Sequence, residues 1–74
     1  MKHEPYNYRI VESGGDYFVH TVYYGTEGNI EAISKDPASP WGADVDSLHI
    51  DFDLMLKGLF KPVLHMSDLT GKAR

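Results

Sequence analysis

The residues of this 74-residue chain most capable of chemistry are its histidines and the carboxylates near them. The run His49-Ile50-Asp51-Phe52-Asp53 places His49 and Asp53 four residues apart, so they share one face if the segment is helical. A stable zinc site takes three or four protein ligands, and this face offers two. We therefore interpret the run as a solvated helix face without a metal, and we expect no cofactor.

Arg9 and His20 form a second candidate because both fall in strand-like segments that are neighbours along the chain. Side by side on a sheet, they would suit an anion or carboxylate, or would form a pH-sensitive contact. The alternative is a structural histidine paired across the sheet with a residue such as Glu31. The pattern favours this second interpretation.

Nucleophilic and phosphate-binding motifs are absent from the sequence. No serine lies in a nucleophile elbow, and nothing identifies a general base for any serine. Gly14-Gly15 joins two strand-like segments, whereas a phosphate-binding loop leads from a strand into a helix. We predict that the chain is not an enzyme.

Composition narrows the classes of partner. Eleven acidic and seven basic residues give a net charge of −4, and the basic residues are scattered, so we expect no nucleic-acid partner. The chain has no cysteine, which is typical of a reducing cytoplasm. It shows neither a signal peptide nor an apolar run of the ~20 residues that cross a bilayer. We expect a cytoplasmic protein without a membrane partner.

Three segments with strand-like composition come first, at residues 6–12, 17–24 and 30–35. Gly14-Gly15 predicts a tight hairpin turn between the first two, and Gly28 predicts a left-handed residue in the turn before the third. Pro37 and Pro40 cannot continue a ladder, so the segment 36–42 is expected to cross over as a loop. Within it, Trp41 is expected to plug the end of the core.

A helix is predicted from a cap at Asp44 or Asp46 to a stop at Pro62. Its apolar residues recur at three- and four-residue spacing and predict one buried face, made of Val45, Leu48, Phe52, Met55 and Leu59 and widened by Leu56 and Phe60. Val63 and Leu64 are expected to fold back onto the core as an extended segment. The predicted fold class is α+β, a three-stranded antiparallel meander followed by one C-terminal helix packed on one sheet face. We expect residues 1–74 to form one domain with flexible ends at 1–5 and 65–74.

Pairing residue 12 with 17 and residue 23 with 30 divides the sheet into two faces. One gathers Tyr8, Ile10, Val19, Tyr23, Ile30 and Ala32, and we expect it to be the core under the helix. The other gathers Asn7, Arg9, Val11, Phe18, His20, Val22, Glu31, Ile33 and Lys35. One helix covers one side of such a sheet, so the second face is expected to stay open. Its predicted interaction surface is Arg9, Phe18, His20, Val22 and Ile33, and Val22→Asp is expected to leave the fold intact.

Four motifs carry a resemblance to known proteins: Tyr8-Arg9-Ile10-Val11-Glu12, His20-x-Val22-Tyr23-Tyr24-x-x-x-Gly28, Pro40-x-Gly42 and Lys61-Pro62-Val63-Leu64. They resemble a group of small uncharacterised bacterial proteins, which implies a shared fold. The order of strands, loop, glycine and acidic-capped helix is also similar to HicB-type antitoxin modules. Those antitoxins commonly carry a further DNA-binding segment, which the ten residues after Leu64 cannot supply. The resemblance therefore implies the partner-neutralising half alone.

These observations predict a small non-catalytic interaction or regulatory module. We expect it to bind another protein, or its own copy as a homodimer, through the open sheet face and an exposed strand edge. An antitoxin-like or inhibitor protein that neutralises a protein partner is one alternative. A small-ligand-binding protein or enzyme using the face of His20 and Arg9 is the other.

Overall fold

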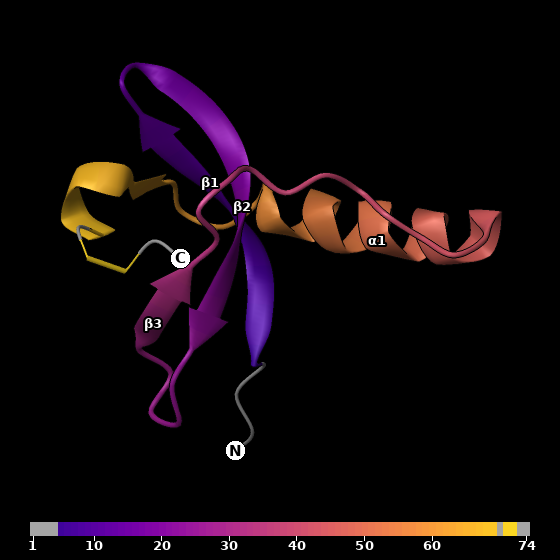
Figure 1. Ribbon diagram of the computed structural model, residues 1–74, viewed down its shortest axis with the longest axis horizontal. Coiled ribbons are helices and arrows are strands. Elements are labelled where there is room, and N and C mark those ends of the chain that lie inside the picture. Colours follow the sequence, from indigo (N-terminus) through magenta and orange to yellow (C-terminus); the bar gives the residue numbers. More distant parts are fainter. Residues whose placement is uncertain (1–4, 70, 73–74) are drawn as a thin grey trace.

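The structure, a computed structural model, describes residues 5–69, 71 and 72. Its elements in chain order are β1 (Tyr6–Ser13), β2 (Asp16–Tyr24), β3 (Ile30–Ile33), α1 (Val45–Gly58), β4 (Leu64–His65) and the 3-10 helix η1 (Met66–Leu69). The strands form one curled sheet in the order β3-β2-β1-β4 (Figure 1). The α+β class is confirmed, with four strands where three were predicted.

β1 and β2 form the predicted hairpin. Glu12 lies opposite Tyr17, as expected, and the alternation of residues along both strands follows from that register. Gly14 and Gly15 have φ angles of 60° and 88°, which a residue with a Cβ rarely adopts. The two glycines therefore allow the tight turn that sets the register of the whole sheet.

The pairing of β2 with β3 differs from the prediction. Tyr23 lies opposite Ala32, and a β-bulge after it places Tyr24 opposite Ile30. A bulge adds one residue to one strand, so it changes which face the following side chain occupies. Ile30 consequently packs with Tyr24 against the buried cluster, and its assignment to the face of Tyr8 was wrong.

The fourth strand, β4, lies parallel to β1, with Leu64 opposite Val11 and His65 opposite Glu12. Leu64 thus folds back as expected, but as part of the sheet. Two residues are too few to show the alternating pattern by which a strand is recognised in sequence. For this reason the prediction of a three-stranded meander missed it.

The core lies on the sheet face that was expected to be open. Val11, Val22 and Ile33 are fully buried, and Leu69 packs against them with Leu64 and Met66. The chain after α1 covers this face. It starts beside β1 as β4, continues through η1, and reaches the far edge, where the Ile33 backbone N–H donates to the carbonyl of Lys72 over 2.8 Å.

Two predictions are therefore corrected. Val22 and Ile33 are not open, because the C-terminal segment supplies the cover that the helix was assumed to supply on the other face. Residues 65–69 are not a flexible end, since they form β4 and η1 and bury Leu69. The predicted flexible residues 1–4, 70, 73 and 74 lie outside the described residues.

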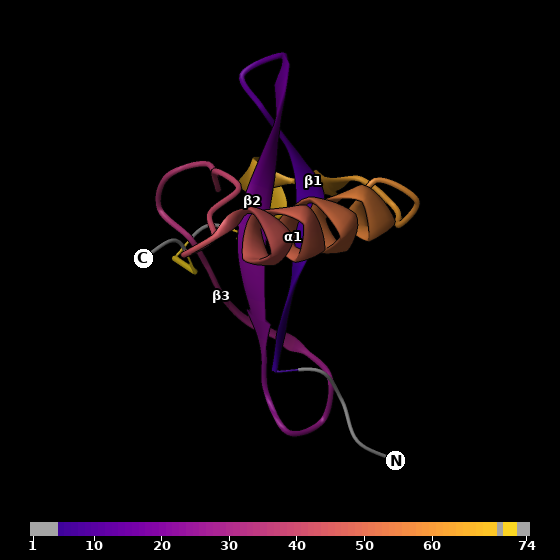
Figure 2. The ribbon, with the colours of Figure 1, turned by 90° about the vertical axis from the view of Figure 1, so that its right-hand side faces the viewer.

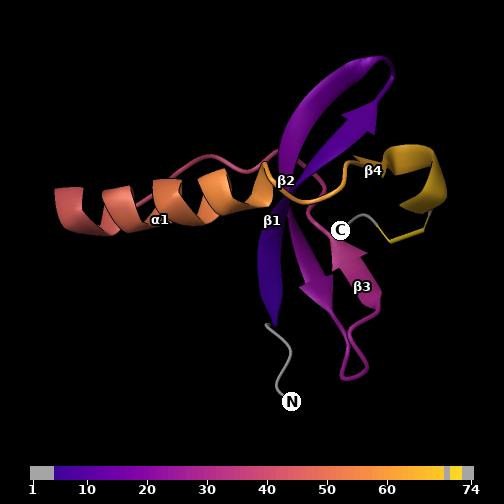
Figure 3. The same cartoon turned by 180° about the vertical axis from the view of Figure 1, so that it is seen from behind.

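α1 begins as predicted, with Asp44 as its N-cap, and ends at Gly58, four residues before Pro62. It lies on the opposite side of the sheet from η1 and extends away from the strands, with its N-terminal end farthest from them (Figures 1 and 3). Figure 2, seen along that direction, shows α1 in front of β1 and β2. Of its residues, Met55 and Gly58 are buried, so the predicted burial of a whole helix face was wrong.

Candidate interaction surface

A helical arm, made of the loop at 34–44, α1 and the following residues 59 and 60, has one carboxylate that contacts both the sheet and the loop. The Tyr8 hydroxyl donates to Asp51 Oδ1 over 2.7 Å, and the Trp41 backbone N–H donates to Asp51 Oδ2 over the same distance. Burial, followed by the hydrogen bond to Asp51, raises the pKa of Tyr8 to about 12. Tyr8 therefore stays protonated and keeps donating at any physiological pH.

The base of the arm also rests on a glycine. A Cβ at Gly58 would collide with the backbone carbonyl of Tyr8, so the last turn of α1 reaches β1 only because residue 58 has no side chain. Arg9 supports the segment that follows, since its Nη2 donates to the carbonyl of Pro62 over 2.7 Å. Strand and arm thus meet at closely fitted backbone.

Close contacts also fix the end of the arm that lies farthest from the sheet. Gly42 lies so close to the backbone of Ser47 and Leu48 that a Cβ has no room there. The Asp44 carboxylate accepts a hydrogen bond from the Ser47 backbone N–H over 2.7 Å, and this bond lowers the pKa of Asp44. The loop therefore runs alongside α1 and holds its first turn, although neither packs on the sheet at this end (Figure 1).

Large apolar side chains are exposed along the arm, and we call them the arm surface: Trp41, Val45, Ile50, Phe52, Leu54, Leu56, Leu59 and Phe60. Each has more than two fifths of its area in solvent. Single exposed apolar residues are ordinary on a protein surface, whereas here eight of them lie along one projecting element. Trp41 is 73% exposed, so its expected role as a plug of the core was wrong.

A pocket of ≈ 300 Å³ lies between α1 and β1, at the base of the arm. Its lining residues include Tyr6, Tyr8, Leu54, Lys57 and Lys61. Tyrosine and lysine residues together suit an apolar group that carries negative charge. The pocket continues the arm surface onto the sheet.

The structure buries some residues of the interaction surface predicted from the sequence and leaves others exposed. Val22 and Ile33 are fully buried, His20 is 3% exposed, and Phe18 is 39% exposed. His20 Nδ1 lies 3.0 Å from the carbonyl oxygen of Ser34 and 3.2 Å from its Oγ. A carbonyl can only accept, so Nδ1 carries the hydrogen. Ser34, not Glu31, is therefore the partner of His20.

Arg9 lies directly opposite His20 in the sheet, as predicted, but each has partners of its own. Arg9 Nη1 donates to the Tyr24 hydroxyl over 3.1 Å, and that hydroxyl donates to Asn7 Oδ1 over 2.8 Å. Arg9 Nε is buried and has no hydrogen-bond partner among the described residues. The guanidinium ties β1 to β2 and to the end of the arm, which is a structural role.

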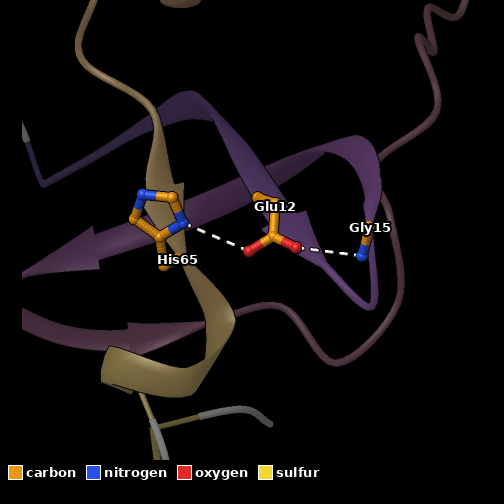
Figure 4. Close-up of polar contacts among 3 residues, drawn as sticks. All are labelled: Glu12, Gly15 and His65. Atoms are coloured by element: carbon orange, nitrogen blue, oxygen red, sulfur yellow. Dashed lines mark hydrogen bonds and ion pairs between the residues drawn. The ribbon is translucent and has the colours of Figure 1, made fainter.

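A third polar contact fixes the C-terminal segment to the hairpin (Figure 4). Glu12 Oε2 accepts from the Gly15 backbone N–H over 2.9 Å, and Glu12 Oε1 lies 3.1 Å from His65 Nδ1. These bonds, with that from Gly15 the larger cause, lower the pKa of Glu12. One carboxylate thus joins the hairpin turn to β4.

His49 and Asp53, the predicted solvated pair, are both exposed on α1. Among the described residues, no three histidine, cysteine, aspartate or glutamate side chains are grouped so that they could hold a metal ion.

The sequence pattern assigned the residues of the arm surface to the core of the protein, except Ile50 and Leu54. Those two lie outside the predicted buried stripe, and their presence was the available signal that α1 is apolar on more than one side.

Comparison with known proteins gives no match for this chain among family models, curated proteins or solved structures. In the described part of the chain, no helix has the length and apolar character that a membrane span requires.

Proposed function

We propose that this chain is a non-catalytic interaction module that binds a protein partner through the arm surface. The observation that supports this most directly is the exposure of α1, which projects from the sheet and buries two of its fourteen residues. An isolated helix of this length is marginal in water, because most helices in proteins are stabilised by packing. An arm so built gains stability when a partner covers it.

The site of binding differs from the sequence-based expectation, while the kind of function stays the same. The C-terminal segment of the chain covers the sheet face around Val22, so we assign binding to the arm instead. A partner-neutralising role, which the resemblance to HicB-type antitoxin modules implies, is a special case of this proposal. The lack of cysteine supports action in the cytoplasm.

The experiment is affinity capture of the tagged full-length protein from its native host at physiological salt. Wild type is compared with Val45→Asp, which places a charge on a side chain that is 67% exposed. A stoichiometric protein, including an untagged copy of this chain, should be recovered with wild type and lost with the variant. Recovery unchanged by the variant, or no stoichiometric protein in either sample, contradicts the proposal.

The matched control is Glu27→Arg, a charge reversal in the exposed turn before β3, away from the arm. It should recover the same partner as wild type. Circular dichroism of both variants should match wild type, because neither changed side chain is buried. If both variants lose the partner, capture depends on charge in general, and the arm is not the site.

The pocket at the base of the arm supports a second candidate, a site for a small apolar anion. Tyr6, Tyr8, Lys57 and Lys61 are among its lining residues. Titration with an aromatic carboxylate such as benzoate, followed by NMR shifts of Tyr6 and Tyr8, tests this candidate. Saturable shifts that Lys57→Ala abolishes would favour it, and linear shifts in wild type would contradict it.

A further inference from the structure

We propose that the pocket between α1 and β1 is a strand-edge site that takes an extended acidic peptide segment. The segment adds to the open edge of β1 and places a carboxylate beside Lys57 and Lys61. This site lies at the base of the arm, so it goes beyond the binding through the arm surface proposed above. Three features carry it: the edge of β1, the path of the chain along that edge, and the charge at the pocket.

The pocket lies along the edge of β1 and not against one face of the sheet. Its lining includes four consecutive residues, Pro5, Tyr6, Asn7 and Tyr8. Side chains alternate between the two faces of a strand, so Tyr6 and Tyr8 occupy one face and Asn7 the other. A cavity that neighbours from both faces line together runs along the backbone between them.

The register of the hairpin determines which backbone groups point to this edge. The Tyr24 N–H donates to the carbonyl of Pro5 over 3.0 Å, so these two residues are a hydrogen-bonded pair of the ladder. Such pairs alternate along two antiparallel strands, and Asn7 belongs to the next one. Tyr6 and Tyr8 therefore direct their N–H and C=O groups away from β2, toward the outer edge.

In the described part of the chain, this outer edge is covered from Tyr8 onward and open before it. Gly58 lies against the Tyr8 carbonyl, and β4 pairs with β1 at Val11 and Glu12. No described residue pairs with Tyr6 on that side, and Figure 3 shows this first part of β1 as the outermost strand of the sheet. An open edge of this kind accepts an extended peptide through main-chain hydrogen bonds, as the same edge accepts β4 farther along.

The charge at the pocket selects an acidic segment. Lys57 and Lys61 are exposed lining residues, and neither forms an ion pair within the described part of the chain, not even Lys57 with Asp53 four residues before it. The two oxygens of Asp51, the carboxylate that contacts Tyr8, are already engaged by hydrogen bonds. Two unpaired lysines at one pocket of a chain with a net charge of −4 therefore favour a carboxylate from outside.

The size and apolar lining of the pocket fit a short segment. Its volume of ≈ 300 Å³ is at the low end for ligand pockets, so it holds one or two side chains. Tyr6 and Tyr8 stand edge to face with ring centroids 6.4 Å apart, and Leu54 adds aliphatic surface. A small anion would use the lysines and leave the strand edge unpaired, whereas an acidic peptide uses both.

NMR titration of the full-length chain with a synthetic hexapeptide of alternating glutamate and valine tests the site. Wild type should show amide shifts at Tyr6 and Tyr8 that saturate below about 1 mM peptide. The same peptide N-methylated at every amide keeps its charges but donates no backbone hydrogen bond, so it should bind about ten-fold more weakly or worse. Absence of saturation, or equal binding of the two peptides, overturns the strand-edge site.

A charge reversal tests the role of the lysines. Lys57→Glu should weaken binding of the hexapeptide by about ten-fold, because it brings a like charge to the peptide carboxylates. Lys35→Glu, the matched control, makes the same change on an exposed residue outside the pocket lining and should bind like wild type. Equal losses in the two variants, or no loss in Lys57→Glu, overturn the proposed selection of an acidic segment.

Two further titrations separate this site from the other proposals. Benzoate has a carboxylate and a ring but no peptide backbone, so benzoate binding as tight as that of the hexapeptide overturns strand addition in favour of the small-anion candidate. Val45→Asp changes the first residue of α1, at the other end of the helix from Lys57, and should bind the hexapeptide like wild type. Failure of the hexapeptide to bind leaves the arm surface to be decided by capture in the native host.

Discussion

The Tyr8 hydroxyl donates a hydrogen bond of 2.7 Å to Asp51 Oδ1, joining β1 to the middle of α1 across 43 residues of sequence. The other oxygen of the same carboxylate holds the backbone of Trp41 in the loop beside α1. Strand, loop and helix therefore meet at a single side chain. The position of the arm depends on this junction, because α1 has little buried apolar contact with the sheet.

Tyr8→Phe should destabilise the protein by about 1.5–3 kcal/mol, the range for a hydrogen bond to a charged acceptor. Its effect should concentrate in the arm, where amide hydrogen exchange of α1 should rise more than that of β2. Tyr6→Phe is the control, since no hydrogen bond of the Tyr6 hydroxyl is found among the described residues, and it should cost less than about 0.5 kcal/mol. Equal effects of the two substitutions would contradict the role of the junction.

The raised pKa of Tyr8 predicts how stability changes at alkaline pH. Burial and Asp51 raise this pKa from 10.0 to about 12 in the folded protein. A group with a raised folded pKa stabilises fully below its unfolded value and loses that contribution as pH rises through the folded value. The free energy of unfolding should therefore fall between about pH 10 and 12 in wild type, and fall less in Tyr8→Phe. Ultraviolet absorbance should show one late-titrating tyrosine that Tyr8→Phe removes.

Gly58→Ala should destabilise the protein although alanine is the better helix former. Helix propensity alone predicts a gain of about 1 kcal/mol at such a position. The added Cβ would instead collide with the Tyr8 carbonyl, and overpacking of this kind costs about 1–3 kcal/mol. Chemical unfolding measures the sign. His49→Ala, on the exposed side of α1, is the control and should be neutral or slightly stabilising; a stabilised Gly58→Ala would contradict the close approach.

Local elements of the fold could be predicted from the sequence, while the choice of core face could not. The hairpin, its register at Glu12 and the cap at Asp44 depend on neighbouring residues, so they leave a local pattern. The cover of the sheet depends on Leu64 and Leu69, which belong to elements of two and four residues without a recognisable period. The bulge at Tyr24 likewise has no local sign. The apolar residues of the arm were assigned to the core because a single sequence does not separate residues buried within a chain from those suited to a partner.

The sequence suggests that Phe60 is buried and that Leu69 lies in a flexible end, so that substitution of Phe60 would destabilise the protein more. The structure predicts the opposite order. Leu69 is 6% exposed and packs on Val11, Val22 and Ile33, so Leu69→Ala should cost about 2–5 kcal/mol. Phe60 is 84% exposed, so Phe60→Ala should change stability by less than about 0.5 kcal/mol. Urea unfolding of both variants measures the contrast. Similar values would mean that the C-terminal segment is not part of the core.

Val22→Asp, which the sequence suggested would leave the fold intact, should prevent folding. Val22 has no exposed area and packs with Val11, Ile33 and Leu69, so its replacement buries a carboxylate among apolar side chains. Val45→Asp makes the same change on the arm surface and should preserve the far-ultraviolet circular dichroism of wild type. A well-folded Val22→Asp with native amide shifts would contradict the assignment of the core face.

The contact of Glu12 with Gly15 and His65 predicts a dependence of stability on acidic pH. The pKa of Glu12 is lowered chiefly by the Gly15 N–H and then by His65. A carboxyl with a lowered folded pKa stabilises fully above its unfolded value, 4.5 here, and loses that contribution as pH falls through the folded value. Urea unfolding of wild type should weaken in that window, and Glu12→Gln should flatten the change.

His65→Ala separates the two causes acting on Glu12. It removes the contact with β4 but leaves the Gly15 N–H, the larger cause, in place. NMR titration of the Glu12 carboxyl carbon should show a pKa still below 4.5 in this variant, though closer to it than in wild type. A return to the full unfolded value would mean that His65, and not the hairpin turn, holds the carboxylate in its charged form.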